Sequence, residues 1–187
     1  MLRTLIAGVL GGIAMFAWTS IAHLATPLAS MGLSPIPNEE PVLNAMQSTM
    51  GDKSGLYFFP WVDPADPNVA KVYQEKAKTM PSGLVMYRPP SAGAEGIPLQ
   101  PIEEFAKEIV QTLIAAVLLS LTVLAGYLAR VGFVAAIGVS AALATNASYW
   151  IWYRFPLEYT LASMTIEIVG ALAAGLVIAA IIRTRAA

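Results

Sequence analysis

The stretch 159–182, YTLASMTIEIVGALAAGLVIAAII, decides the class of this protein, because Glu167 is its single charged side chain. About 20 consecutive apolar residues form a helix long enough to cross the roughly 30 Å hydrocarbon core of a membrane. We therefore predict a transmembrane helix here. A carboxyl group inside such a span is costly, so we expect Glu167 to face the interior of a helix bundle or a wet cavity.

Three further stretches without charge have the length of a span. They are 4–38, whose apolar core is 5–25, and the runs 109–129 and 131–153. The whole chain is 57% hydrophobic and 12% charged, about half the charged share of a typical soluble domain. We therefore predict an integral membrane protein, an all-α bundle of four transmembrane helices over about 1–26, 109–129, 131–153 and 159–182. The first helix is expected to remain uncleaved, because its apolar run is longer than that of a signal peptide and no good A-x-A site follows it.

The composition excludes several kinds of site. The chain has no cysteine and one histidine, which excludes disulfides, thiolate metal sites and a multi-histidine metal site within the chain. No basic cluster is present to neutralise phosphates, so we expect no nucleic acid partner. No GxSxG, HExxH or P-loop pattern occurs, and the sequence assembles no nucleophile, base and orienting group. An enzymatic role, with Glu167 or His23 as acid or base, is therefore the third hypothesis.

Arginines predict the orientation of the chain. Arg3 precedes the first predicted span, Arg130 lies between the second and third, and Arg183 and Arg185 follow the fourth. The positive-inside rule places all of these in the cytoplasm. Both termini are then cytoplasmic, and residues 27–108 lie outside, in the periplasm if the membrane is a bacterial inner membrane.

The external segment 27–108 is predicted to be a small α+β unit. It contains 12 of the 13 prolines and ten of the 12 acidic residues. Its apolar and turn residues predict a helix, a strand, a second helix and a second strand, with the strands paired. The predicted elements are 38–50, 54–60, 66–80 and 82–89, followed by an irregular linker over 90–98 and a helix that begins at Pro101 and continues into the second span.

Polar residues of the predicted spans gather in their outer halves. Glu167 lies eight residues below Tyr159, about 12 Å along a helix, and Asn146 lies at a similar depth, whereas 168–182 contains no polar side chain. This asymmetry favours an outward-facing polar cavity, or a polar contact between helices, over a conducting path. The residues of the candidate polar pocket are Glu167, Asn146, His23, Trp18, Gln111 and Thr165. A structural role for Glu167, as a protonated acid bonded to Asn146 or to a backbone carbonyl, remains open.

Small residues predict close contacts between the helices. Gly8 and Gly12 form a GxxxG spacing in the first span, and Gly170 and Ala174 give the fourth span a similar face. Such faces let helix backbones approach one another within a membrane. We therefore expect a compact bundle.

The part of the chain that ends at Pro60 resembles a known group of proteins. The segments GGIAMFAW (11–18), NEE (38–40) and SGLYFFP (54–60) are similar to those of a family of small uncharacterised bacterial inner-membrane proteins. The resemblance implies a bacterial inner membrane as the location and carries no activity with it.

Two functional hypotheses lead. The first is an accessory subunit or assembly factor of the inner membrane, which contacts a membrane-protein partner or a second copy of the chain through the external unit. The alternative is a binder of a lipid, a quinone or another amphiphile in an outward-facing pocket between the helices. The lipid bilayer is the expected surrounding in both cases, and the residues identify no particular cofactor.

Overall fold

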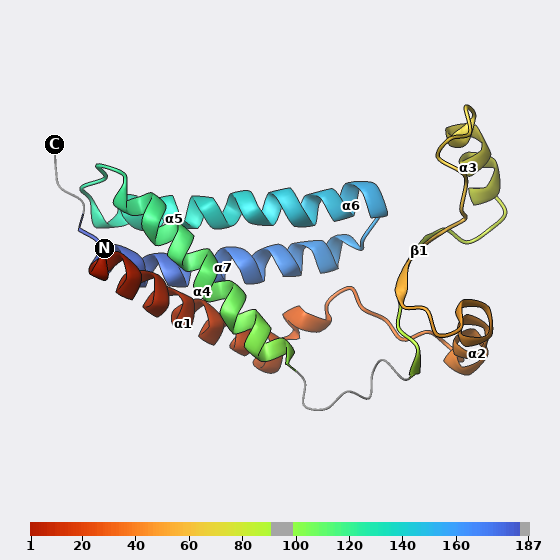
Figure 1. Ribbon diagram of the computed structural model, residues 1–187, viewed down its shortest axis with the longest axis horizontal. Helices are drawn as coiled ribbons and strands as arrows, with labels where there is room; N and C mark the ends of the chain where they lie inside the picture. The colour runs from red at the N-terminus through yellow and green to blue at the C-terminus, as the bar shows by residue number, and fades with distance from the viewer. Residues whose placement is uncertain (91–98, 184–187) are drawn as a thin grey trace. The chain divides into compact units, whose positions relative to one another are not determined.

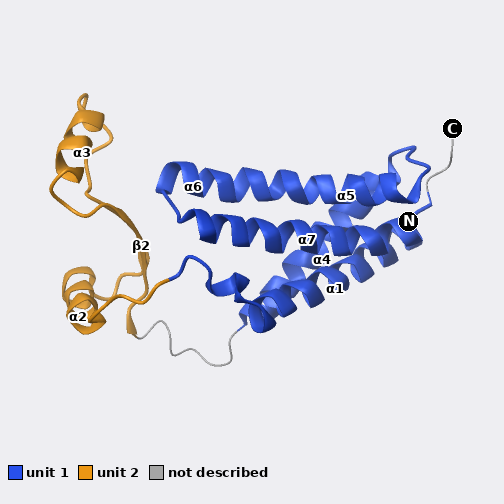
Figure 2. Cartoon of the chain, turned by 180° about the vertical axis from the view of Figure 1, so that it is seen from behind, with its two compact units in different colours: residues 1–33, 98–187 blue, residues 34–97 orange. Residues whose placement is uncertain are grey.

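The computed structural model of the chain describes residues 1–90 and 99–183 and divides the protein into two compact units. Unit 1 comprises Met1–Leu33 and Pro98–Ala187, and unit 2 comprises Ser34–Ile97 (Figure 2). The irregular linker predicted over 90–98, apart from Pro90, lies outside the described residues, as does Arg185.

Unit 1 is a bundle of long helices that alternate in direction (Figure 1). Helix α1 packs on α4 and on α7, and α7 packs in turn on α5. After α5 the helix continues through a π-helical stretch, η3, and then α6, and a short 3₁₀ turn, η1, follows α1. Their bounds are α1 Leu2–Ala25, η1 Pro27–Ser30, α4 Gln100–Ser120, α5 Tyr127–Ala142, η3 Leu143–Ala147, α6 Ser148–Tyr153 and α7 Leu157–Ile181.

Three helices of the described residues are long and apolar enough to cross a membrane. They are Leu2–Ala25, Leu157–Ile181 and the continuous helix Tyr127–Tyr153. This confirms the helical, membrane-compatible character of the chain. Helix α4 does not belong to this set, because four charged residues, Glu103, Glu104, Lys107 and Glu108, occupy its first half.

The chain between the second and third predicted spans differs from the expectation. The helix expected over 109–129 ends at Ser120, residues 121–126 are not helical, and α5 begins at Tyr127 rather than at 131. Arg130 stabilises this non-helical segment, because its guanidinium donates hydrogen bonds to the carbonyls of Leu124 and Ala125. The expected short turn at Arg130 is thus the first turn of α5, and Arg130 itself is buried.

Glycines bring α1 and α4 into backbone contact. A Cβ atom on Gly8 would lie 2.8 Å from the Cα of Leu113, and one on Gly12 would lie 2.9 Å from the Cα of Ile109. Both distances are shorter than an ordinary carbon–carbon contact of about 3.5–4.0 Å. The GxxxG spacing therefore faces α4, and the hydroxyl of Thr112 donates to the carbonyl of Gly8 at 2.8 Å.

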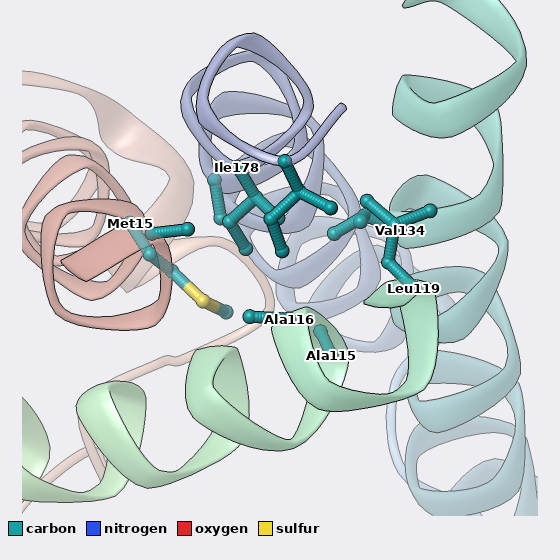
Figure 3. Packing of buried hydrophobic residues seen from close by; sticks show 9 residues of the cluster. Met15, Ala115, Ala116, Leu119, Val134 and Ile178 are labelled. Atoms are coloured by element: carbon teal, nitrogen blue, oxygen red, sulfur yellow. The ribbon is translucent and has the colours of Figure 1, made fainter. Parts of the chain in front are cut away.

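A cluster of buried apolar side chains closes the centre of unit 1. Met15 from α1, Leu119 from α4, Val134 from α5 and Ile178 from α7 point toward one another (Figure 3). Small residues such as Ala116 fill the remaining space. All four long helices thus contribute to one core.

Unit 2 has the predicted order of helix, strand, helix, strand. The elements are α2 Glu39–Met50, β1 Gly55–Phe59, α3 Val69–Ala77 and β2 Gly83–Tyr87. The strands pair antiparallel, with Gly55 opposite Tyr87 and Phe59 opposite Gly83. The hydroxyl of Tyr87 donates to the carbonyl of Gly51 at 2.9 Å, and Phe58 stacks on Tyr73 with ring centroids 5.7 Å apart.

Candidate functional site: a polar cavity and an apolar groove

A polar cavity opens near one end of unit 1, where α1 ends and α4 and α7 begin. Its volume is about 230 Å³, and residues of α1, α4, η3 and α7 line it. Among the predicted site residues, Glu167, Asn146 and His23 all line this cavity, from three different elements. These three polar residues, which the sequence placed in the outer halves of their spans, are thus brought together.

The other three predicted site residues lie elsewhere. The indole Nε1 of Trp18 donates to the carbonyl of Ile166 at 2.9 Å, which holds α1 against α7 one residue before Glu167. Gln111 is half-buried in α4 and does not line the cavity. Thr165 is exposed, and its hydroxyl donates to the carbonyl of Leu161 at 2.7 Å.

Glu108 is a functional candidate that the sequence alone did not reveal. Its side chain is 0% exposed and lines the cavity. The hydroxyl of Thr19 donates to Oε1 at 2.6 Å, whereas Oε2 has no hydrogen-bond partner among the described residues. A buried carboxyl oxygen without a partner is rare and usually has a reason in function.

The only lysine of the cavity pairs with a different acid. The Nζ of Lys107 lies 2.8 Å from Glu104 and 4.0 Å from Glu108. Lys107 and Glu104 are both about half exposed, and such exposed pairs contribute about 0–1 kcal/mol. Lys107 therefore serves mainly as the partner of Glu104.

Two further lining residues present acceptors. The Nδ1 atom of His23 lies 2.8 Å from the carbonyl oxygen of Thr19, and a carbonyl only accepts, so Nδ1 carries the hydrogen and Nε2 is the acceptor of the neutral ring. Asn146 uses its Nδ2 to donate to the carbonyl of Ala142 at 3.2 Å, which leaves the amide Oδ1 as its acceptor.

Asn146 belongs to an unusual part of the helix. It lies in η3, the π-helical stretch between α5 and α6, together with Thr145, which also lines the cavity. Short π-helical stretches are rare and occur frequently at functional sites. The departure from α-helical geometry thus coincides with the cavity.

An apolar groove adjoins the polar cavity. It lies between the last turns of α1 and the first turns of α4, has a volume of about 380 Å³, and includes Phe16, Leu24 and Pro101. Thr19, His23 and Glu104 line both the groove and the polar cavity. The two spaces therefore share one boundary, with polar groups on one side and apolar groups on the other.

Within the described residues, no group of three or more histidine, aspartate or glutamate side chains could hold a metal ion. Comparison of the chain with protein-family models, with curated proteins and with solved structures found no match.

Proposed function

We propose that this chain is an integral membrane protein that binds an amphiphile, with the polar head group in the polar cavity and the apolar tail in the groove. The observation that carries the proposal is the boundary of Thr19, His23 and Glu104 that both spaces share. A molecule that occupies both spaces must have a polar end and an apolar end. Pockets between the helices of a bundle are a common location for such ligands.

A fourth transmembrane helix is part of the proposal. Helix α4 has 21 residues, about 31 Å at 1.5 Å per residue. Its second half exposes large apolar side chains, among them Ile114 and Leu118, as expected of a lipid-facing surface. Its charged first half lines the cavity, with Glu108 buried and Glu104 paired to Lys107, which makes the charges compatible with a position in the bundle.

The proposed orientation places the cavity on the outer side of a bacterial inner membrane. Arg3 lies in the first turn of α1, Arg130 in the first turn of α5, and Arg183 follows α7, so that all three belong to the same end of unit 1 (Figure 1). The positive-inside rule assigns this end to the cytoplasm. The cavity opens near the opposite end, and the segment that joins α1 to α4 then lies in the periplasm.

Native mass spectrometry of the protein, released gently from its own membranes, tests the proposal. The expected result is a constant mass added to that of the chain, which is lost in Glu167→Leu because this variant lacks a carboxyl group of the cavity. Glu158→Leu is the matched control, because Glu158 is an exposed acid in the first turn of the same helix. Retention of the added mass in Glu167→Leu, or bare protein throughout, would contradict the proposal.

A second candidate function is the accessory subunit or assembly factor. Leu56 and Met86 lie directly opposite each other in the sheet of unit 2 and are 64% and 77% exposed, and Trp61 nearby in sequence is exposed as well. A two-stranded sheet is marginally stable alone, and exposed apolar clusters commonly mark contact surfaces. These observations favour a protein partner or a second copy of the chain on unit 2.

Native gel electrophoresis of solubilised membranes tests this second candidate. We expect a discrete complex larger than the monomer, which disappears when Leu56→Ser and Met86→Ser are combined. Leu43→Ser, at an exposed position of α2 in the same unit, is the control. If the unsubstituted protein migrates as a monomer, this candidate function is wrong. If a complex persists in the double variant, its contact surface does not depend on Leu56 and Met86.

A further inference from the structure

We infer that the head group bound in the polar cavity is a primary ammonium group, held by Glu108 and Glu167, so that the ligand is a cationic alkylamine-like amphiphile. The inference rests on the proposed function and adds the chemical class of the ligand to it. Three independent features of the cavity support it: its charge, its buried unpartnered oxygen, and its excess of hydrogen-bond acceptors.

The charge of the lining favours a cation. Glu104, Glu108 and Glu167 line the cavity with one lysine, Lys107, and that lysine pairs with Glu104 at 2.8 Å. Glu108 lies farther from the same ammonium, at 4.0 Å, and Glu167 forms no ion pair within the described residues. An anionic head group, such as a phosphate or a carboxylate, would meet like charges here, whereas a cation would be attracted by both acids.

The buried oxygen supplies the anchor. Glu108 is fully buried, its Oε1 is already bonded to Thr19, and its Oε2 has no partner among the described residues. A buried carboxyl oxygen without a hydrogen-bond partner is unfavourable, because it has lost its water. An ammonium N–H donated to Oε2 removes that deficit and forms a charge-assisted bond, which is stronger than a neutral one.

The hydrogen-bonding roles of the lining distinguish a primary ammonium from other cations and from neutral heads. The Thr19 hydroxyl is bonded to Glu108 and Lys107 is paired with Glu104, whereas the Nε2 of a neutral His23 ring and the Oδ1 of Asn146 are acceptors. The hydroxyls of Thr145 and Ser163, which also line the cavity, can accept as well as donate. A primary ammonium carries three N–H donors and no acceptor, which matches this set. A quaternary ammonium has no N–H to donate, and a hydroxyl head group has a single donor and no charge.

The groove accounts for the rest of the ligand. It begins at the boundary residues His23 and Glu104 and continues past Phe16 and Leu24. Phe16 is held in place by an edge-to-face contact with Phe105, with ring centroids 5.2 Å apart. An apolar surface of this kind suits one alkyl chain, and the location of the ammonium at its inner end orients that chain along the groove.

The test compares three probes of equal chain length, decylamine, decanol and decanoate, on the purified full-length protein in detergent. Binding is measured by native mass spectrometry at increasing probe concentration. We expect one equivalent of decylamine to bind saturably, at least about tenfold more tightly than decanol, with decanoate the weakest. Glu108→Gln preserves the volume of the side chain and the acceptor for Thr19, and should weaken decylamine about tenfold or more, because it removes a charged hydrogen bond.

Two controls separate ligand recognition from a structural effect. Glu103→Gln makes the same change at an exposed residue of the first turn of α4 that lines neither space, so it should leave all three affinities unchanged. In Glu108→Gln the affinity for decanol should also stay unchanged. Glu167→Gln is the second variant, with the same expected selectivity, in case Glu108→Gln does not fold.

The outcomes distinguish the inference from the function on which it rests. Equal binding of decylamine and decanol, or an affinity for decylamine that neither glutamine variant changes, would overturn the ammonium assignment and leave an amphiphile site in place. Absence of saturable binding for all three probes would overturn both. Tighter binding of decanoate would reverse the sign of the head group.

Discussion

Replacement of Gly138 by alanine is expected to force α5 away from α7, and a second substitution should restore the contact. Gly138 is buried in α5, where a Cβ atom would lie 2.2 Å from the Cβ of Ala171 in α7. The same atom would lie 3.7 Å from the Cα of Ala171, an ordinary contact distance. The collision therefore involves a single methyl group on each side.

The magnitude follows from these distances. Carbon atoms in contact normally lie about 3.5–4.0 Å apart, so Gly138→Ala requires α5 and α7 to separate locally by about 1.5 Å. Overpacking of this kind costs about 1–3 kcal/mol. Ala171→Gly alone removes a buried methyl group and lowers helix propensity, and should cost about 1–2 kcal/mol. The double variant should be close to Ala171→Gly alone, with a favourable coupling of about 1–3 kcal/mol.

Reversible unfolding in mixed detergent micelles, followed by circular dichroism, measures the free energy of unfolding of each variant. Gly132→Ala is the control in the same helix, because a Cβ atom there would have no neighbour within 4 Å, and it should be nearly neutral. Simple additivity, with the double variant less stable than either single variant, would refute the close contact of α5 with α7.

Three further predictions concern the contacts that hold unit 1 together. Gly8→Ala should reduce the free energy of unfolding by about 1–3 kcal/mol in the same assay, because the added Cβ would lie 2.8 Å from the Cα of Leu113; unchanged stability would show that α1 and α4 do not touch there. Arg130→Met should speed amide hydrogen exchange in the segment that joins α4 to α5, because the carbonyls of Leu124, Ala125 and Ala179 lose the guanidinium that donates to them. Exchange at the rate of the unsubstituted protein would contradict the buried position of Arg130. Trp18→Phe should reduce the free energy of unfolding by about 1 kcal/mol, because it removes an indole hydrogen bond to α7, and an equally stable variant would show that this bond contributes nothing.

Hydropathy predicted α1, α7 and the helix Tyr127–Tyr153 well, because each is a long run with almost no charge. It failed at α4, where the predicted span began at the first residue after Glu108. The predicted helix start at Pro101 is confirmed, because α4 begins at Gln100 and continues unbroken past Glu108, but the helix ends at Ser120 rather than at 129. Counting charges along the sequence cannot show where the buried part of α4 begins, because the burial of a charged residue in α4 depends on how closely another helix approaches it.

The candidate site was predictable in part. Counting depth along the spans brought Glu167 and Asn146 to a similar level and His23 into the same outer half, and the structure places all three around one cavity. Glu108 was assigned to the external segment and missed. A signal was present, because Glu108 and Thr112 share one helical face with Ala115 and Leu119, and all four are buried. A predicted span that begins at 109 leaves out Glu108, the first residue of this face, so the buried face is not recognised as one pattern.

The apolar groove was beyond what the sequence could predict. Its two walls, Phe16 on α1 and Pro101 on α4, come from opposite sides of unit 2 in the chain order. Neither residue is unusual in its own segment. The glycines of α1 let α4 approach closely and so help to set the distance between these two helices. That distance cannot be predicted from the residue pattern of either helix alone.

The π-helical stretch Leu143–Ala147 has a consequence for how this protein tolerates changes in length. A π turn holds about one residue more than the α turn it replaces, so deletion of one residue in this stretch could be absorbed by a return to regular α-helix. Such a deletion would leave everything beyond it facing nearly as before, because a π turn and an α turn each complete about one rotation. Gly138 would keep its contact with α7, and Tyr149 and Tyr153 on α6 would keep their direction. The helix thus contains a point at which one residue can be lost without turning its aromatic end relative to the half that packs in the bundle.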